Sequence, residues 1–160
     1  MSSARSWLAA ALTVAALALP TRSSAQLLDA KVISLQAART MVAACEAEAR
    51  RNNWNVSIAV VNAAGELLLF NRMDDAPSSS VEISQGKART AASFRRPTRA
   101  LDSAMTAGRM AYLAFPGAIP VEGGVPVMVD GHCVGAVGVS GVKSTEDAQI
   151  AKAGIAALGA

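Results

Sequence analysis

The stretch from residue 123 to residue 141, GGVPVMVDGHCVGAVGVSG, constrains the fold of this 160-residue chain more than any other part of it. Residues 125–129 and 132–139 are rich in β-branched side chains, and Asp130-Gly131 between them favours the two positive φ angles of a type I′ turn. The pattern predicts an antiparallel hairpin. Because glycines occur on both faces of its second strand, we expect a helix or another backbone to approach closely, with a flat ligand as the alternative.

The rest of the chain alternates between helical and strand patterns. Apolar residues at three-to-four spacing after Ser34 predict a helix to about residue 51, and further helices are expected over 81–93, over 98–113 and from residue 144. Two β-rich runs, 56–62 and 67–73, predict a first hairpin, and a short strand is expected near 118–120. Successive hairpins favour an α+β fold: one domain with a central antiparallel sheet of about five strands and flanking helices.

Residues 1–25 have the pattern of a signal peptide. Arg5 precedes an apolar run over 7–20, and Ser23-Ser24-Ala25 forms a small-residue cleavage site before Gln26. The run is shorter than the roughly 20 residues of a transmembrane helix. We therefore expect residues 26–160 to be a periplasmic or secreted domain; an uncleaved anchor is the alternative.

Removing this segment also changes the charge. It carries Arg5 and Arg22 and no acidic residue, so the formal net charge falls from +3 to +1. The basic cluster around Pro97 is interpreted as a solvated loop. Neither a nucleic-acid partner nor a membrane surface is predicted for the mature domain.

Two cysteines remain in the mature chain, Cys45 in the first helix and Cys133 in the last strand. In an oxidising compartment they could form a disulfide that joins helix to sheet. Both also suit a role as small buried hydrophobes. The sequence leaves the two alternatives open.

One group of polar residues suggests a ligand site. Arg72 and Asp74 lie at the end of a predicted strand, and Lys87 and Thr90 share one face of a predicted helix. If the strand end meets this helix, the two cations could hold a carboxylate, with the backbone amides of Gly123-Gly124 as added donors. The alternative is an ordinary solvated surface.

Several runs together resemble a known family, the GlcG/HbpS-like haem-binding family, also called PduO C-terminal-domain-like. They are FNRMD at 70–74, KARTA at 87–91, GGVP at 123–126 and GAVGVSG at 135–141, and the resemblance spans residues 28–158. It implies a compact α+β domain in higher oligomers, often octamers. Some members bind haem or take part in haem and iron sensing, and others accompany glycolate or diol metabolism.

Haem binding can be weighed on this chain's own residues. There is no CxxCH motif, which excludes covalent c-type attachment. The single histidine, His132, is the first candidate for an iron ligand, and Met73, Met110 and Tyr112 are others. Since His132 follows a turn, an exposed histidine without a ligand is the alternative.

The leading hypothesis is an exported, homo-oligomeric haem-binding protein that acts in haem capture or in iron or redox sensing with a sensor protein. The second is a periplasmic protein that binds, or acts on, a small organic acid held by Arg72 and Lys87. A proton-transfer enzyme with Lys87 or Asp74 as base, and a purely structural partner, stay open. The chain has no GxSxG motif and no zinc-ligand spacing.

Overall fold

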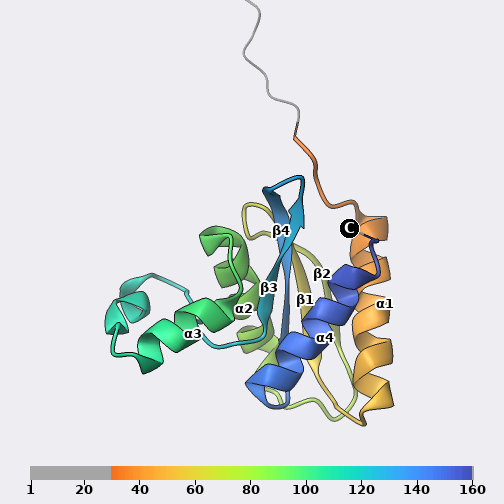
Figure 1. The fold of residues 1–160 in the computed structure, drawn as a ribbon. Coiled ribbons are helices and arrows are strands. Elements are labelled where there is room, and N and C mark those ends of the chain that lie inside the picture. The colour runs from red at the N-terminus through yellow and green to blue at the C-terminus, as the bar shows by residue number, and fades with distance from the viewer. Residues whose placement is uncertain (1–29, 160) are drawn as a thin grey trace, which may run out of the picture. The chain divides into compact units, whose positions relative to one another are not determined.

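The computed structural model describes residues 30–159, and the predicted signal peptide lies outside them. From Lys31 onward the chain forms one compact unit of the α+β class, as expected. Figure 1 shows its elements. In chain order they are α1 (Leu35–Arg51), β1 (Ser57–Asn62), β2 (Leu67–Arg72), α2 (Ser80–Phe94), α3 (Thr98–Thr106), the 3₁₀ helix η1 (Met110–Ala114), β3 (Gly124–Val129), β4 (His132–Ser140) and α4 (Ser144–Ala156).

The sheet has four strands in the order β2-β1-β4-β3, and every neighbouring pair is antiparallel. The expectation of about five strands is therefore wrong by one, because residues 118–120 form no strand. Ala118 N–H donates to Phe115 O, and Ile119 N–H donates to Thr90 Oγ1. Pro120 has no N–H to offer a neighbouring strand. None of these three residues therefore has a backbone N–H available for hydrogen bonding to a neighbouring strand.

The β3–β4 hairpin forms as the Asp130-Gly131 pair predicts. Asp130 has φ 48° and Gly131 has φ 77°, which are the positive angles of a type I′ turn. The register pairs Gly124 with Gly138 and slips once, between Val127 and Met128. Beyond the slip the strand continues to the tip, so the hairpin holds a bulge.

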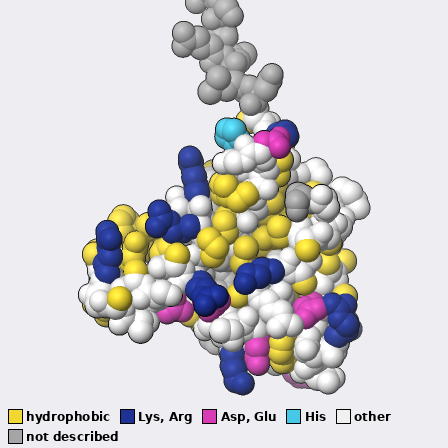
Figure 2. Space-filling view, viewed as in Figure 1, with side chains coloured by type: hydrophobic (Ala, Val, Ile, Leu, Met, Phe, Trp, Pro, Cys, Tyr) yellow, Lys and Arg dark blue, Asp and Glu magenta, His cyan; other side chains and the backbone are white. Residues whose placement is uncertain are grey.

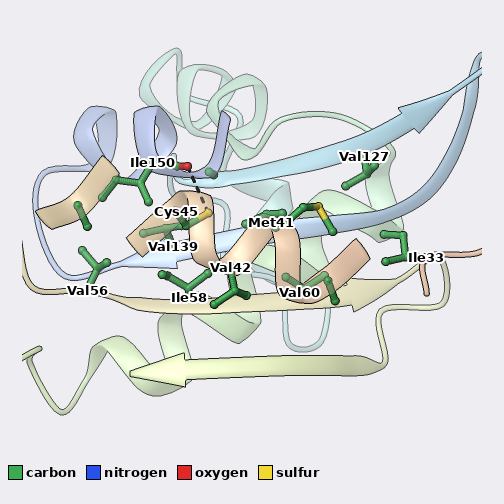
Figure 3. Close-up of a cluster of buried hydrophobic side chains, with 14 of the residues drawn as sticks. Ile33, Met41, Val42, Cys45, Val56, Ile58, Val60, Val127, Val139 and Ile150 are labelled. Carbon is green, nitrogen blue, oxygen red and sulfur yellow. Dashed lines mark hydrogen bonds between the residues drawn. The ribbon is translucent and has the colours of Figure 1, made fainter. Parts of the chain in front are cut away.

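Helices α1 and α4 cover one face of the sheet. Ser34 caps α1 by accepting the Ala37 N–H at 3.1 Å, which confirms the predicted start of that helix. Between these helices and the sheet lies the main core (Figure 3). It is built from aliphatic and sulfur side chains, among them Met41, Val42, Cys45, Val56, Ile58, Val60, Val127, Val139 and Ile150.

Helix α2 covers the opposite face and lies very close to β4. A Cβ on Gly138 would be 2.1 Å from the Ser84 carbonyl oxygen and 2.5 Å from the Ala88 amide nitrogen. The contact is possible only without a side chain at residue 138. The predicted close approach of a helix is confirmed at Gly138, and at Gly135 the neighbour is the β1 backbone, since a Cβ there would be 2.3 Å from Val61 O.

The segment expected as one helix over 98–113 divides in two. Helix α3 ends at Thr106, Gly108 takes a φ of 94°, and η1 begins at Met110. The positive φ lies outside the helical region, so the glycine turns the chain. In Figure 1, α3 and η1 extend to the left of the sheet. Within the described residues, no helix is both long and apolar enough to cross a membrane.

Candidate functional site

An apolar hollow of about 460 Å³ lies at the C-terminal end of α2, and we call it the aromatic cavity. The β1–β2 turn, the last turns of α2 and residues 115–118 form its walls. Phe94 and Phe115 meet edge to face with their ring centroids 5.2 Å apart. Arg89 is exposed and supplies a cation among the lining residues. An apolar wall beside one fixed charge suits a flat ligand that carries an acidic group.

The walls of this cavity are held in place by Thr90. Its Oγ1 donates to Gly86 O at 2.7 Å and accepts the Ile119 N–H at 2.8 Å, so residues 118–119 are tied to α2. Thr90 was expected to help hold a carboxylate. Its hydroxyl instead has protein partners on both sides, although the residue does line the cavity.

Tyr112 joins the two phenylalanines in an aromatic cluster but is not among the residues that line the cavity. Its ring centroid is 5.8 Å from that of Phe94 and 6.3 Å from that of Phe115. The guanidinium of Arg109 lies 5.2 Å from the Tyr112 ring centroid, in a cation–π arrangement. Tyr112, one of the four side chains proposed as iron ligands, is therefore part of this aromatic cluster.

Lys87 belongs to a buried ion pair. Its Nζ lies 2.7 Å from Asp147 Oδ2 and 3.1 Å from Val139 O, and both charged side chains are 2% exposed. Lys87 comes from α2 and Asp147 from α4, so the pair joins the helices of the two opposite faces. Burial raises the pKa of Asp147, and the neighbouring ammonium opposes that rise.

The ammonium also completes the hydrogen bonding of β4. Val139 N–H donates to Gly123 O at 3.0 Å. In an antiparallel ladder the N–H and C=O of one residue face the same neighbouring strand. Val139 C=O therefore points to the β3 side, just before the first residue of β3, where no strand residue offers it an N–H. Lys87 supplies the donor there. The side chain is therefore used by the fold and is not free for a ligand at Arg72.

Gly123 and Gly124 pack closely against this ion pair. A Cβ on Gly123, which has φ 129°, would be 2.7 Å from Lys87 Nζ. Gly124 N–H donates to Thr98 Oγ1 at 2.9 Å. The amide of Gly124, expected as a donor for an anion, thus already has a protein acceptor.

Arg72, Met73 and Asp74 lie in a different hollow, the polar cavity, of about 350 Å³. It is formed by the last turns of α1, the α1–β1 loop and the end of β2. Arg72 Nη2 donates to Ala76 O at 2.6 Å. Lys87 and Thr90 are not among its lining residues, so the structure does not bring the four predicted residues together.

His132 lies at the exposed tip of the β3–β4 hairpin, where Figure 2 shows the histidine in cyan. Its Nδ1 is 2.9 Å from Asp130 O. Cys133, the next residue, has its Sγ 3.9 Å from Ala92 O on the α2 face. Because successive strand side chains point to opposite faces, His132 points away from the face that carries the aromatic cavity.

The two cysteines are free thiols. Cys45 is buried and donates to Ile150 O at 3.3 Å, on the α1–α4 side. Cys133 faces α2 on the other side of the sheet. Burial raises the pKa of Cys45 to about 12. The disulfide alternative is therefore wrong, and Cys45 behaves as a small core residue.

Two features of these sites were not predicted. Asp147 lies in the first turn of α4, and nothing in the local sequence pattern marks it as the partner of Lys87. Arg89 and Phe94 are both on α2, and Phe115 reaches them only because the chain returns to α2 after α3 and η1. No group of three or more His, Cys, Asp or Glu side chains within residues 30–159 is placed to hold a metal ion.

Comparison with known proteins gives consistent results. A family model described as "Haem degrading protein HbpS-like" matches residues 33–156. Protein GlcG of Escherichia coli K12 is 49% identical over 109 residues, which cover 68% of this chain and 81% of that protein.

Solved structures show the same fold. A variant of Streptomyces reticuli HbpS superposes with a TM-score of 0.77 at 32% identity, over 85% of this chain and 93% of the other. A PduOC–haem complex gives a TM-score of 0.74 at 26% identity, over 79% and 95% of the two chains.

Proposed function

Because the chain belongs to the HbpS-like family, we propose that it is a haem-binding protein and that haem occupies the aromatic cavity. The supporting observation is the cavity itself. Its volume of about 460 Å³ and its apolar, aromatic wall suit part of a porphyrin ring, and the exposed Arg89 can hold a propionate. The haem bound by one structural relative makes this ligand the first to test.

The residues present fit the porphyrin better than they fit the iron. The lining side chains Phe94 and Phe115 can pack against a flat ring, and Arg89 can make a charge-assisted hydrogen bond. None of the ten residues that line the cavity is His, Cys, Met or Tyr. Bound haem would supply an iron centre that changes redox state, and this chain's residues would set its orientation and its exposure to water.

The experiment is a haemin titration followed by the Soret absorbance. Wild type is expected to bind saturably, and Arg89→Glu to bind at least about tenfold more weakly, because a charge-assisted contact is replaced by repulsion. Arg39→Glu, the same change on an exposed residue of α1, is the matched control. Equal binding by both variants would place haem elsewhere, and no saturable shift in wild type would end the haem proposal.

His132→Ala tests the first ligand candidate in the same assay. Since His132 points to the opposite face from the cavity, we expect the variant to keep its affinity. A lost Soret shift would instead assign the iron to the hairpin tip, and so to a site outside the aromatic cavity.

The small-acid hypothesis has less support. The polar cavity around Arg72 is lined by two guanidiniums and three carboxylates, so its charge does not favour an anion. Lys87, its expected second cation, is paired with Asp147.

Export, a homo-oligomeric state and a sensor partner complete the proposal. The pattern of residues 1–25 supports export. The mass of the protein recovered from the periplasm would test it, with Gln26 as the expected first residue. Exposed apolar side chains on η1 and just after it, Met110, Leu113 and Phe115, support self-association.

A further inference from the structure

The polar cavity has a composition that the haem proposal does not use. Eight of its ten lining residues are polar, and they include three carboxamides, two guanidiniums and three carboxylates. The other two are Trp54 and Met73, which pack against the main core from the cavity side. Flat polar groups beside one indole distinguish this hollow from the aromatic cavity.

The charges of this cavity disfavour a charged ligand. Glu46 is already engaged, since it accepts a hydrogen bond from Asn71 and lies 3.6 Å from Arg50. Asp74 and Asp75 are exposed acceptors at the opposite wall. The guanidiniums of Arg50 and Arg72 also line the cavity, so an anion would meet carboxylates and a cation would meet guanidiniums. A net-neutral ligand therefore fits best.

A hydroxyl group can bond to the acceptor and the donor side chains of this cavity at the same time. It can donate to a carboxylate such as Asp75 and accept from an amide such as Asn53 or Asn55. Trp54 is half-buried and presents a flat apolar surface, against which the C–H face of a ring or chain can pack. From these features we propose that the polar cavity binds a neutral polyhydroxylated molecule, a sugar or a polyol.

The backbone holds both walls in place before any ligand arrives. Asn53 has φ 56° at the end of α1, and Trp54 N–H donates to Ala49 O at 2.9 Å. On the other wall Asp75 has φ 61°, and Ala76 N–H donates to Met73 O at 3.2 Å. Walls fixed in this way lower the entropic cost of binding.

Trp54 makes the test direct. The chain has two tryptophans, so Trp7→Phe leaves Trp54 as the one indole, whether or not residues 1–25 are removed. Fluorescence of this protein is titrated with D-glucose, D-mannitol, glycine and succinate. We expect a saturable change with glucose or mannitol only. A response to glycine or succinate alone, or no saturable response, would overturn the proposal.

Asp75→Asn and Asp130→Asn form a matched pair for that assay. Both aspartates are exposed and have positive φ, 61° and 48°, which asparagine also tolerates. Asp75→Asn is expected to weaken sugar or polyol binding about tenfold, because a hydrogen bond to a charged acceptor is lost, and Asp130→Asn to leave it unchanged. Equal effects would show that the fluorescence change does not come from this cavity.

Discussion

Lys87→Met is expected to lower the free energy of unfolding by about 3–5 kcal/mol near neutral pH, because it leaves the Asp147 carboxylate buried without its counter-charge. The side chains of both partners are 2% exposed, so solvent cannot replace the lost ammonium. The variant also removes the donor to Val139 O. Against a typical total of about 5–15 kcal/mol, the loss is large enough to shift the urea midpoint by about 2 M.

The assay is urea unfolding followed by far-ultraviolet circular dichroism. Lys152→Met, on the exposed side of α4, is the control for the change of side chain and should stay within about 0.5 kcal/mol of wild type. Lys87→Met with Asp147→Leu removes both charges and should recover most of the loss. If Lys87→Met proved as stable as the Lys152→Met control, the ion pair would not hold the two layers together.

The loss should depend on pH with a definite sign. Burial raises the pKa of Asp147 above the ordinary range of an aspartate, and the variant lacks the ammonium that opposes the rise. The folded chain then keeps this proton to a higher pH than the unfolded chain, so the free energy of unfolding falls as pH rises between the two pKa values. The deficit of Lys87→Met should accordingly be smaller near about pH 5 than near about pH 8. A deficit that grows on acidification would refute this reasoning.

Three further changes test other parts of the structure. Gly138→Ala should destabilise the fold by about 1–3 kcal/mol in urea unfolding, since its Cβ would meet the Ser84 carbonyl oxygen at 2.1 Å; unchanged stability would show that α2 can move away from β4. Gly108→Ala should cost about 1 kcal/mol through its φ of 94°, although open space surrounds the site; a gain in stability and helix content would show that α3 can continue through it. Iodoacetamide should modify Cys133 first and Cys45 only after unfolding, because burial raises the pKa of Cys45 to about 12; mass spectrometry of peptides would detect the reverse order.

Local signals in the sequence were enough for most of the elements. Ser34 marks the start of α1, and Asp130-Gly131 marks the β3–β4 turn, because a cap and a type I′ turn depend on neighbouring residues. The strand expected at 118–120 failed for a reason outside its own sequence. The hydroxyl that takes its backbone donor belongs to Thr90, almost thirty residues earlier.

The candidate sites were harder to predict than the elements. Arg72 and Asp74 were correctly placed at one strand end, but Lys87 was assigned to them without its partner being known. Asp147 is sixty positions away along the chain and meets Lys87 only because α2 and α4 both reach the end of β4. Local patterns identify residues that can carry charge, whereas tertiary contacts decide which of them are neutralised.

The Lys87–Asp147 pair connects the helices on the two faces of the sheet without a covalent bond, and both thiols of the chain are free. The cohesion of residues 30–159 is therefore independent of redox potential. Folding of this domain needs no oxidant or disulfide isomerase, and a reductant leaves its cross-layer connection intact. Acid acts on the connection directly, since its strength depends on one proton at Asp147.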